Sequence, residues 1–170
     1  ILTGSQIPIC EKESDGVPNF TNALKVARDG VVKEVSVWFH KNLFRGSCVT
    51  KIDSKSIDGF DSPNHPVLAT LSKEIEYTET VKKNVESSSF FKKIEDSIFY
   101  LSISPGFNSR AIHACLNDDL VKGIVISVFG SGTLPIKVDD PIYMRLSALN
   151  LPVLVVSECL KGGMEMGKYE

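Results

Sequence analysis

The chain has 170 residues with a formal net charge of −2, and 42% of its residues are hydrophobic and 24% charged. With this net charge and no run of like charges, nothing in the sequence indicates binding to nucleic acid or to an anionic membrane. Its apolar stretches are much shorter than the about 20 residues that span a bilayer, so a membrane-spanning protein is not expected.

Apolar spacing predicts the elements of the first half. Phe20 and Leu24, with the alanines around them, recur three and four residues apart, which predicts a helix over 19–29 that Gly30 ends. The stretch 54–66 is rich in Ser, Asp, Gly and Pro and is expected to be irregular. Short or alternating apolar runs predict strands at 1–3, 35–39, 43–44 and 75–78.

The second half begins with a change in composition over 86–96, where serines and charged residues indicate an interdomain connection. Beyond it, apolar runs alternate with helical patterns: strand 98–103, helix 108–117, strand 123–129, helix 139–149 and strand 152–156. Strands that are apolar throughout and alternate with helices predict a parallel sheet covered on both faces.

The predicted fold class is therefore α/β, in two parts. Residues 1–85 are interpreted as the end of an N-terminal α/β domain and 86–96 as a linker. Residues 97–170 are interpreted as most of a smaller C-terminal βαβαβ domain with a parallel sheet. Because the chain starts inside a predicted strand, we expect a preceding portion of the fold to lie outside it.

Two segments carry residues suited to chemistry. Lys51 follows a glycine-containing loop, and a lysine acts as a base where its surroundings favour the neutral amine. On residue type alone, an ordinary solvated lysine fits as well. The segment Gly4-Ser5-Gln6-Ile7-Pro8 follows a predicted strand, and ligands bind at the carboxyl ends of strands in α/β sheets; a plain turn is the alternative. Asp53 either holds the Lys51 ammonium or caps its own loop.

The cysteines and histidines do not indicate a metal or redox site. The four cysteines are far apart with no Cys-x-x-Cys pair, and the three histidines lack ligand spacing. We therefore expect reduced thiols in a cytoplasmic protein and no metal. Gly130-Ser131-Gly132-Thr133 lacks the full pattern of a nucleotide-binding loop.

Several short segments, in this order and spacing, resemble the middle of the type I (cytosolic) L-asparaginases. They are Gly4-Ser5-Gln6-Ile7-Pro8, Ser14-Asp15-Gly16, Phe44-Arg45-Gly46, Val49-Thr50-Lys51, Ser62-Pro63-Asn64, Phe129-Gly130-Ser131-Gly132 and Glu158-Cys159. The Thr-Gly-Gly-Thr and His-Gly-Thr-Asp-Thr segments that carry the family's nucleophile do not occur in this sequence. The resemblance is thus to an internal fragment, which alone is expected to be inactive.

The resemblance implies hydrolysis of L-asparagine to L-aspartate and ammonia through a threonine acyl-enzyme, without a metal or organic cofactor. It implies that Lys51 is the catalytic lysine and that Ser5 lies against the substrate, chiefly through main-chain atoms. It also implies a cytoplasmic homodimer or tetramer, with L-asparagine as the small-molecule partner.

The resemblance also places Thr133 and Cys159 in a region that forms an effector site or a subunit contact. For Cys159, a buried structural cysteine is the favoured interpretation. Thr133 stands where relatives commonly carry Asn, which argues against an effector site regulated by asparagine. Two alternatives to an asparaginase stay open. One is the asparaginase-like glutaminase subunit of a tRNA-dependent amidotransferase, and the other is a non-catalytic relative that binds an amino acid or a partner.

Overall fold

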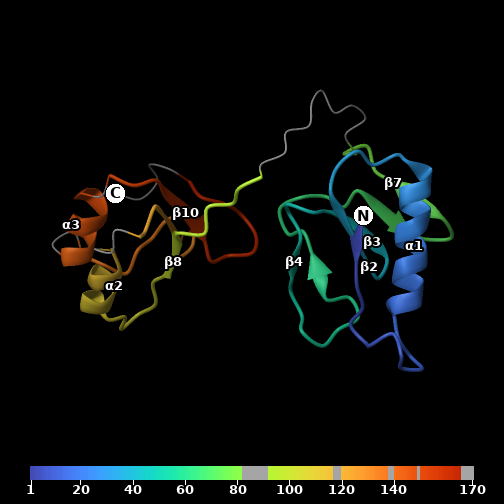
Figure 1. Cartoon of the computed structure of the whole chain (residues 1–170), viewed down its shortest axis with the longest axis horizontal. Helices are drawn as coiled ribbons and strands as arrows, with labels where there is room; N and C mark the ends of the chain where they lie inside the picture. The colour runs from blue at the N-terminus through green and yellow to red at the C-terminus, as the bar shows by residue number, and fades with distance from the viewer. Residues whose placement is uncertain (82–91, 117–119, 138–139, 149, 166–170) are drawn as a thin grey trace. The chain divides into compact units, whose positions relative to one another are not determined.

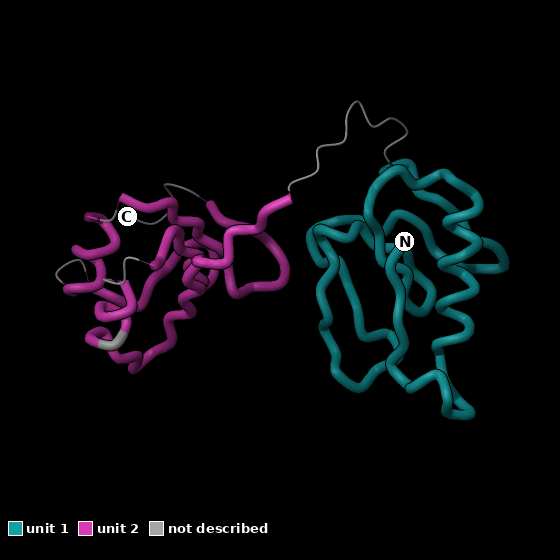
Figure 2. Tube along the Cα trace, in the orientation of Figure 1, with its two compact units in different colours: residues 1–89 teal, residues 90–170 magenta. Residues whose placement is uncertain are grey.

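The computed structural model describes residues 1–81, 92–116, 120–137, 140–148 and 150–165 (Figure 1). It consists of two compact units, residues 1–89 and 90–170, shown in different colours in Figure 2 and described here one at a time. The predicted connection over 86–96 lies outside the described residues from 86 to 91. Its described part, 92–96, contains no helix or strand.

Unit 1 is built on a five-stranded sheet in the order β1-β2-β3-β6-β7. β1 pairs with β2 in parallel, and the other pairs are antiparallel. The strands are β1 (Leu2–Thr3), β2 (Ser36–Phe39), β3 (Asn42–Arg45), β6 (Ala69–Leu71) and β7 (Ile75–Tyr77). β6 was not predicted from the sequence.

Helix α1 (Gly16–Asp29) packs on one face of this sheet (Figure 1). It begins three residues before the predicted start and ends as predicted, because Gly30 adopts a left-handed φ of 64°. Buried Ala23 and Val26 meet Trp38 of β2, which is fully buried. The helix therefore fixes the position of the loop that precedes it relative to the sheet.

A two-stranded ribbon lies beside the opposite face of the sheet. It consists of β4 (Thr50–Lys51) and β5 (Phe60–Asp61), which pair antiparallel. The Phe60 ring packs against the Phe39 ring, with 4.6 Å between their centroids. β5 lies inside the stretch predicted to be irregular, and its aromatic contact anchors the ribbon that carries Lys51.

Gly46, at the end of β3, has no room for a side chain. A Cβ at this position would lie 2.8 Å from the carbonyl oxygen of Val35, a backbone atom that also accepts the Gly46 N–H at 2.9 Å. We expect Gly46→Ala to destabilise unit 1 by about 2 kcal/mol, as overpacking does. Urea unfolding followed by Trp38 fluorescence measures this loss, since Trp38 is the sole tryptophan and lies in unit 1.

Gly4→Ala is the matched control, because a Cβ there meets no atom within 4 Å and its φ lies outside the left-handed region. An equal loss of stability in both variants would show that the Gly46 contact is not the cause.

Unit 2 contains a parallel three-stranded sheet in the order β10-β9-β8. Its elements, in chain order, are β8 (Ile98–Ser102), α2 (Ser109–Leu116), β9 (Gly123–Val128), α3 (Pro141–Ala148) and β10 (Val153–Ser157). The predicted βαβαβ order and the α/β class are confirmed.

The helices of unit 2 cover one face of its sheet. Ile112 and Leu146 pack on the core formed by buried Leu101, Ile124 and Ile126. On β8 and β10, Tyr100 is 61% exposed and Leu154 59% exposed. Within the described ranges, the prediction that helices cover both faces is therefore wrong, because both helices pack on the same side.

Candidate active site

The loop that follows β1, residues 4–7, is fixed by the carboxylate of Asp15. Asp15 lies immediately before α1 and is 9% exposed. Its Oδ1 accepts a hydrogen bond from the backbone N–H of Ile7 at 2.9 Å, and both its oxygens accept from the backbone N–H of Gln6 at 3.0 Å. One largely buried carboxylate therefore sets the path of this loop.

Asn19, in the first turn of α1, joins the carboxyl ends of β1 and β2. Its Nδ2 donates to the Gly4 carbonyl at 3.0 Å and to Asp15 Oδ2 at 2.9 Å. Its Oδ1 accepts from the N–H of His40 at 2.9 Å, where the chain has a positive φ of 53°. Ligands bind at this end of parallel strands in α/β folds. Asn19 therefore shapes a candidate ligand-binding site.

These hydrogen bonds set the charge state of Asp15. Burial raises the pKa of the Asp15 carboxyl, but the loop N–H groups and the Asn19 amide lower it by more. The pKa therefore lies below its ordinary value, and the carboxylate is ionised and accepts hydrogen bonds at neutral pH.

Lys51 projects from β4 next to this loop. Its side chain is exposed, and its Nζ donates to Gln6 Oε1 at 2.7 Å. The same ammonium lies 5.3 Å from the centroid of the Phe60 ring, a distance at which a cation is attracted to an aromatic face. The structure thus brings Lys51 together with the segment Gly4-Ser5-Gln6-Ile7-Pro8, which lies more than 40 residues earlier in the chain.

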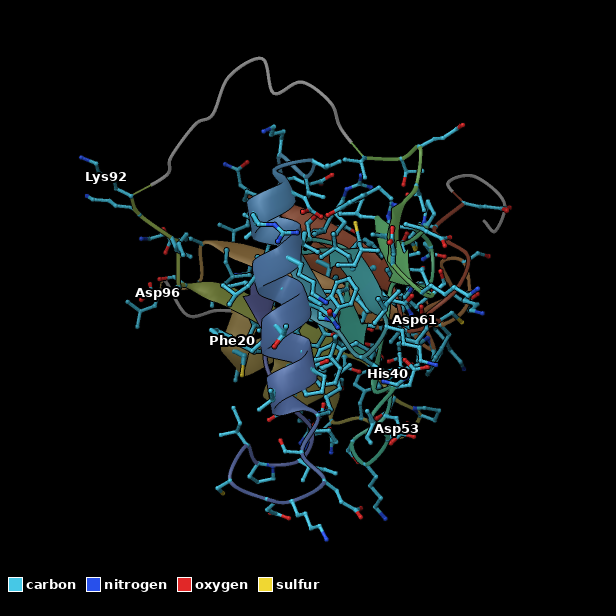
Figure 3. The ribbon with its side chains drawn as sticks, turned by 90° about the vertical axis from the view of Figure 1, so that its right-hand side faces the viewer. Phe20, His40, Asp53, Asp61, Lys92 and Asp96 are labelled. Carbon is cyan, nitrogen blue, oxygen red and sulfur yellow. The ribbon has the colours of Figure 1, made fainter. Side chains whose placement is uncertain are left out.

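Asp53 caps its own loop. Its Oδ1 accepts from the backbone N–H groups of Lys55 at 2.7 Å and Ser56 at 2.9 Å. These two bonds, with a smaller contribution from the charge of Lys51, lower the pKa of Asp53. Of the two interpretations open for this residue, loop capping is the one supported by hydrogen bonds. Figure 3 shows Asp53 and His40 toward the end of unit 1 at which α1 begins.

Ser5, the predicted substrate-binding residue, is exposed and lies between Gly4 and Gln6. Its neighbours on both sides are fixed, Gly4 through its carbonyl and Gln6 through its N–H. The main chain is therefore held by hydrogen bonds on both sides of Ser5, and Ser5 itself is exposed. Its contact with a substrate stays a prediction.

Gln6 was not predicted as a site residue from the sequence, although it lies inside the segment Gly4-Ser5-Gln6-Ile7-Pro8. The sequence feature that could have identified Gln6 is its position after a predicted strand, where α/β folds bind ligands. Its amide also offers both hydrogen-bond donors and an acceptor. Only the fold shows that its partner is Lys51.

In unit 2, Thr133 and Cys159 lie on neighbouring loops. Cys159 is exposed, so the interpretation of this residue as a buried structural cysteine is wrong. The N–H of Thr133 donates to the carbonyl of Phe129, and the Phe129 N–H donates back to Thr133, both at 2.9 Å. Ser157 connects the loops, because its Oγ donates to the Gly130 carbonyl and accepts from the Cys159 N–H at 3.0 Å. Both loops follow carboxyl ends of parallel strands. An effector or subunit contact there stays a prediction.

Neither a metal site nor a membrane span occurs in the described part of the chain. Among the described residues, no three His, Cys, Asp or Glu side chains gather as metal ligands would. No helix of the described ranges is long and apolar enough to cross a membrane.

Unit 1 is thus an α/β unit with a lysine fixed beside the loop that follows a parallel strand. Residues 1–83 match the family model described as asparaginase, N-terminal. The chain is 31% identical to L-asparaginase 1 of Escherichia coli (strain K12), over 99% of this chain and 51% of that protein. The chain is therefore similar to asparaginases, through the family model over its first 83 residues and through L-asparaginase 1 over nearly its whole length.

Other relatives carry other names. The chain is 34% identical to the 60 kDa lysophospholipase of Mus musculus, over 96% of this chain and 30% of that protein. It is 27% identical to a subunit of the glutamyl-tRNA(Gln) amidotransferase of Methanobrevibacter smithii, over 99% of this chain and 41% of that protein.

Among solved structures, the thermostable L-asparaginase from Thermococcus kodakarensis superposes with a TM-score of 0.88 at 27% identity, covering 99% of this chain and 51% of that one. The chain therefore spans about half the length of this archaeal relative and of the Escherichia coli enzyme, and less than a third of the mouse protein.

Proposed function

We propose that this chain supplies the lysine of an L-asparaginase active site, which hydrolyses L-asparagine to L-aspartate and ammonia. The observation that carries the proposal is the 2.7 Å hydrogen bond from Lys51 Nζ to Gln6 Oε1. This hydrogen bond joins a side chain that can transfer a proton to the loop at the carboxyl end of a parallel strand, where α/β folds bind ligands. The likeness to L-asparaginases over nearly the whole chain supports the same assignment.

In the proposed reaction, a threonine hydroxyl from residues outside this chain attacks the side-chain carbonyl carbon of L-asparagine. The C–N bond breaks, the amide nitrogen leaves as ammonia, and water then hydrolyses the acyl-enzyme ester to release L-aspartate. A hydroxyl needs a base to become a nucleophile. Lys51, with a Thr-Asp pair also outside this chain, takes that proton and passes it to the leaving amide nitrogen.

The loop main chain around Ser5 lies against the substrate amide in this proposal. Main-chain N–H groups stabilise the oxyanion of the tetrahedral intermediate. No metal or organic cofactor takes part. We further propose a cytoplasmic homodimer or tetramer, in which the loops of Thr133 and Cys159 form an effector or subunit contact.

Ammonia release from L-asparagine tests the proposal. We expect none from the 170-residue chain, because it holds no Thr-Gly-Gly-Thr or His-Gly-Thr-Asp-Thr segment. We expect turnover from a longer protein that carries this chain together with those segments. Turnover by the 170 residues alone would show that the nucleophile has been misplaced.

Two other reactions are supported by named relatives. One is hydrolysis of a lysophospholipid ester, because the mouse relative is named a lysophospholipase. Glutamine hydrolysis for a partner protein corresponds to the amidotransferase relative. Parallel assays of the longer protein with L-asparagine, L-glutamine and lysophosphatidylcholine discriminate among the three. Asparagine binding without turnover would indicate the non-catalytic alternative.

A further inference from the structure

Gln6 is fixed from three sides. Its backbone N–H donates to both oxygens of Asp15 at 3.0 Å, and its Nε2 donates to the Ser54 carbonyl at 2.7 Å. Its Oε1 accepts from Lys51 Nζ at 2.7 Å. Both polar atoms of the Gln6 side-chain amide and its backbone N–H therefore make hydrogen bonds, as expected of an ordered residue.

The chemistry of the two partners decides which way the amide faces. The Ser54 carbonyl can only accept a hydrogen bond, and the Lys51 ammonium can only donate. With the amide reversed, Nε2 would face another donor and Oε1 would face another acceptor. The oxygen of Gln6 must therefore point at Lys51.

Within this chain, Lys51 depends on the contact with Gln6 for its direction. Its side chain is exposed, and Gln6 provides the one hydrogen bond to Nζ within the described part of the chain. The Phe60 ring, 5.3 Å away, attracts a cation without fixing the direction of its N–H groups. An exposed lysine has a long, flexible side chain, so without an acceptor its amine samples many positions.

We propose that Gln6 is a positioning residue for Lys51. Asp15 fixes the Gln6 backbone, and the Gln6 amide directs the Lys51 amine toward the loop at the end of β1. The inference rests on the proposed function only in taking Lys51 as catalytic. The neutral amide suits this task, because it accepts a hydrogen bond from Lys51 without placing a further charge beside it.

The positioning is tested first in the 170-residue chain, without catalysis. Relaxation of the lysine Cε nuclei by NMR compares Lys51 with Lys55, an exposed lysine of the following loop. In the wild type we expect Lys51 to be more ordered than Lys55. In Gln6→Met, which keeps the length of the side chain but removes its amide, we expect Lys51 to become as mobile as Lys55. Unchanged order of Lys51 would overturn the inference, with Trp38 fluorescence showing whether unit 1 stays folded.

The kinetic test uses a longer, active protein that carries this chain. We expect Gln6→Met to lower kcat roughly 10- to 100-fold, the size of a modest misplacement of a catalytic group. KM should change little, since the loss falls on the chemical step.

Lys51→Met in the same protein distinguishes a failure of the positioning role of Gln6 from a failure of the proposed function. If Lys51→Met abolishes turnover and Gln6→Met keeps the wild-type kcat, the positioning role is wrong and the proposed function stands. If Lys51→Met keeps its turnover, the proposed function is wrong. The NMR comparison then still decides whether Gln6 orders Lys51.

Discussion

Replacing Lys51 by methionine lowers kcat for L-asparagine by about two to four orders of magnitude in the longer protein, the range for losing a positioned proton-transfer group. Methionine keeps most of the side-chain length and its contact with Phe60 but cannot carry a proton. KM stays near the wild-type value if the loop of residues 4–7 makes the substrate contacts. Steady-state ammonia release measures both parameters.

The matched control is Lys55→Met, the same substitution at an exposed lysine on the following loop. Lys55 uses its backbone N–H to bond Asp53, and that bond is retained in the variant. We expect wild-type kcat and KM. Turnover close to the wild type in Lys51→Met would remove this lysine from the mechanism, whatever the family likeness. A loss in both variants would indicate an effect on the loop instead.

The sequence predicted α1 correctly as a helix, but the two large apolar residues that gave its spacing lie outside the core. Phe20 and Leu24 gave the helical spacing, yet they are 56% and 55% exposed, and Phe20 is labelled in Figure 3. Asn19 is 1% exposed, and the structure explains why a polar residue is buried there. Its amide bonds the Gly4 carbonyl, Asp15 and the His40 N–H, so burial leaves its polar atoms satisfied.

The candidate site was predictable as two separate segments but not as a contact. Lys51 and the segment around Ser5 were each predicted from a short local motif. They meet through the side-chain hydrogen bond between Gln6 and Lys51. Gln6 follows β1, which pairs in parallel with β2, whereas Lys51 belongs to the separate β4–β5 ribbon. No local pattern encodes such a pairing, because it follows from topology and from the Phe39–Phe60 packing that anchors the ribbon.

Replacing Asp15 by asparagine tests the buried carboxylate that fixes the loop of the site. In Asp15→Asn, an NH₂ group replaces one of two oxygens that face only donors, so at least one hydrogen bond to a charge becomes a repulsive contact. Hydrogen bonds to charged groups contribute about 1.5–3 kcal/mol each, so we expect unit 1 to lose about 3 kcal/mol at pH 7. Urea unfolding followed by Trp38 fluorescence reports on this unit alone.

The sign of the pH dependence follows from the direction of the pKa. The Asp15 carboxyl has a lower pKa in the folded chain than in the unfolded one, where the pKa is about 3.9. Its stabilising contribution is therefore complete above about pH 5 and is lost as the pH falls through the folded value. Asparagine does not titrate, so the difference between wild type and variant should shrink as the pH falls below about 5.

Asp58→Asn serves as the control, since Asp58 is exposed. It should match the wild type at neutral pH. A constant deficit of Asp15→Asn at every pH would mean that the variant acts through packing rather than through the charge. The ionised carboxylate would then not be what fixes the loop beside Lys51, and Gln6 would need another anchor for its backbone.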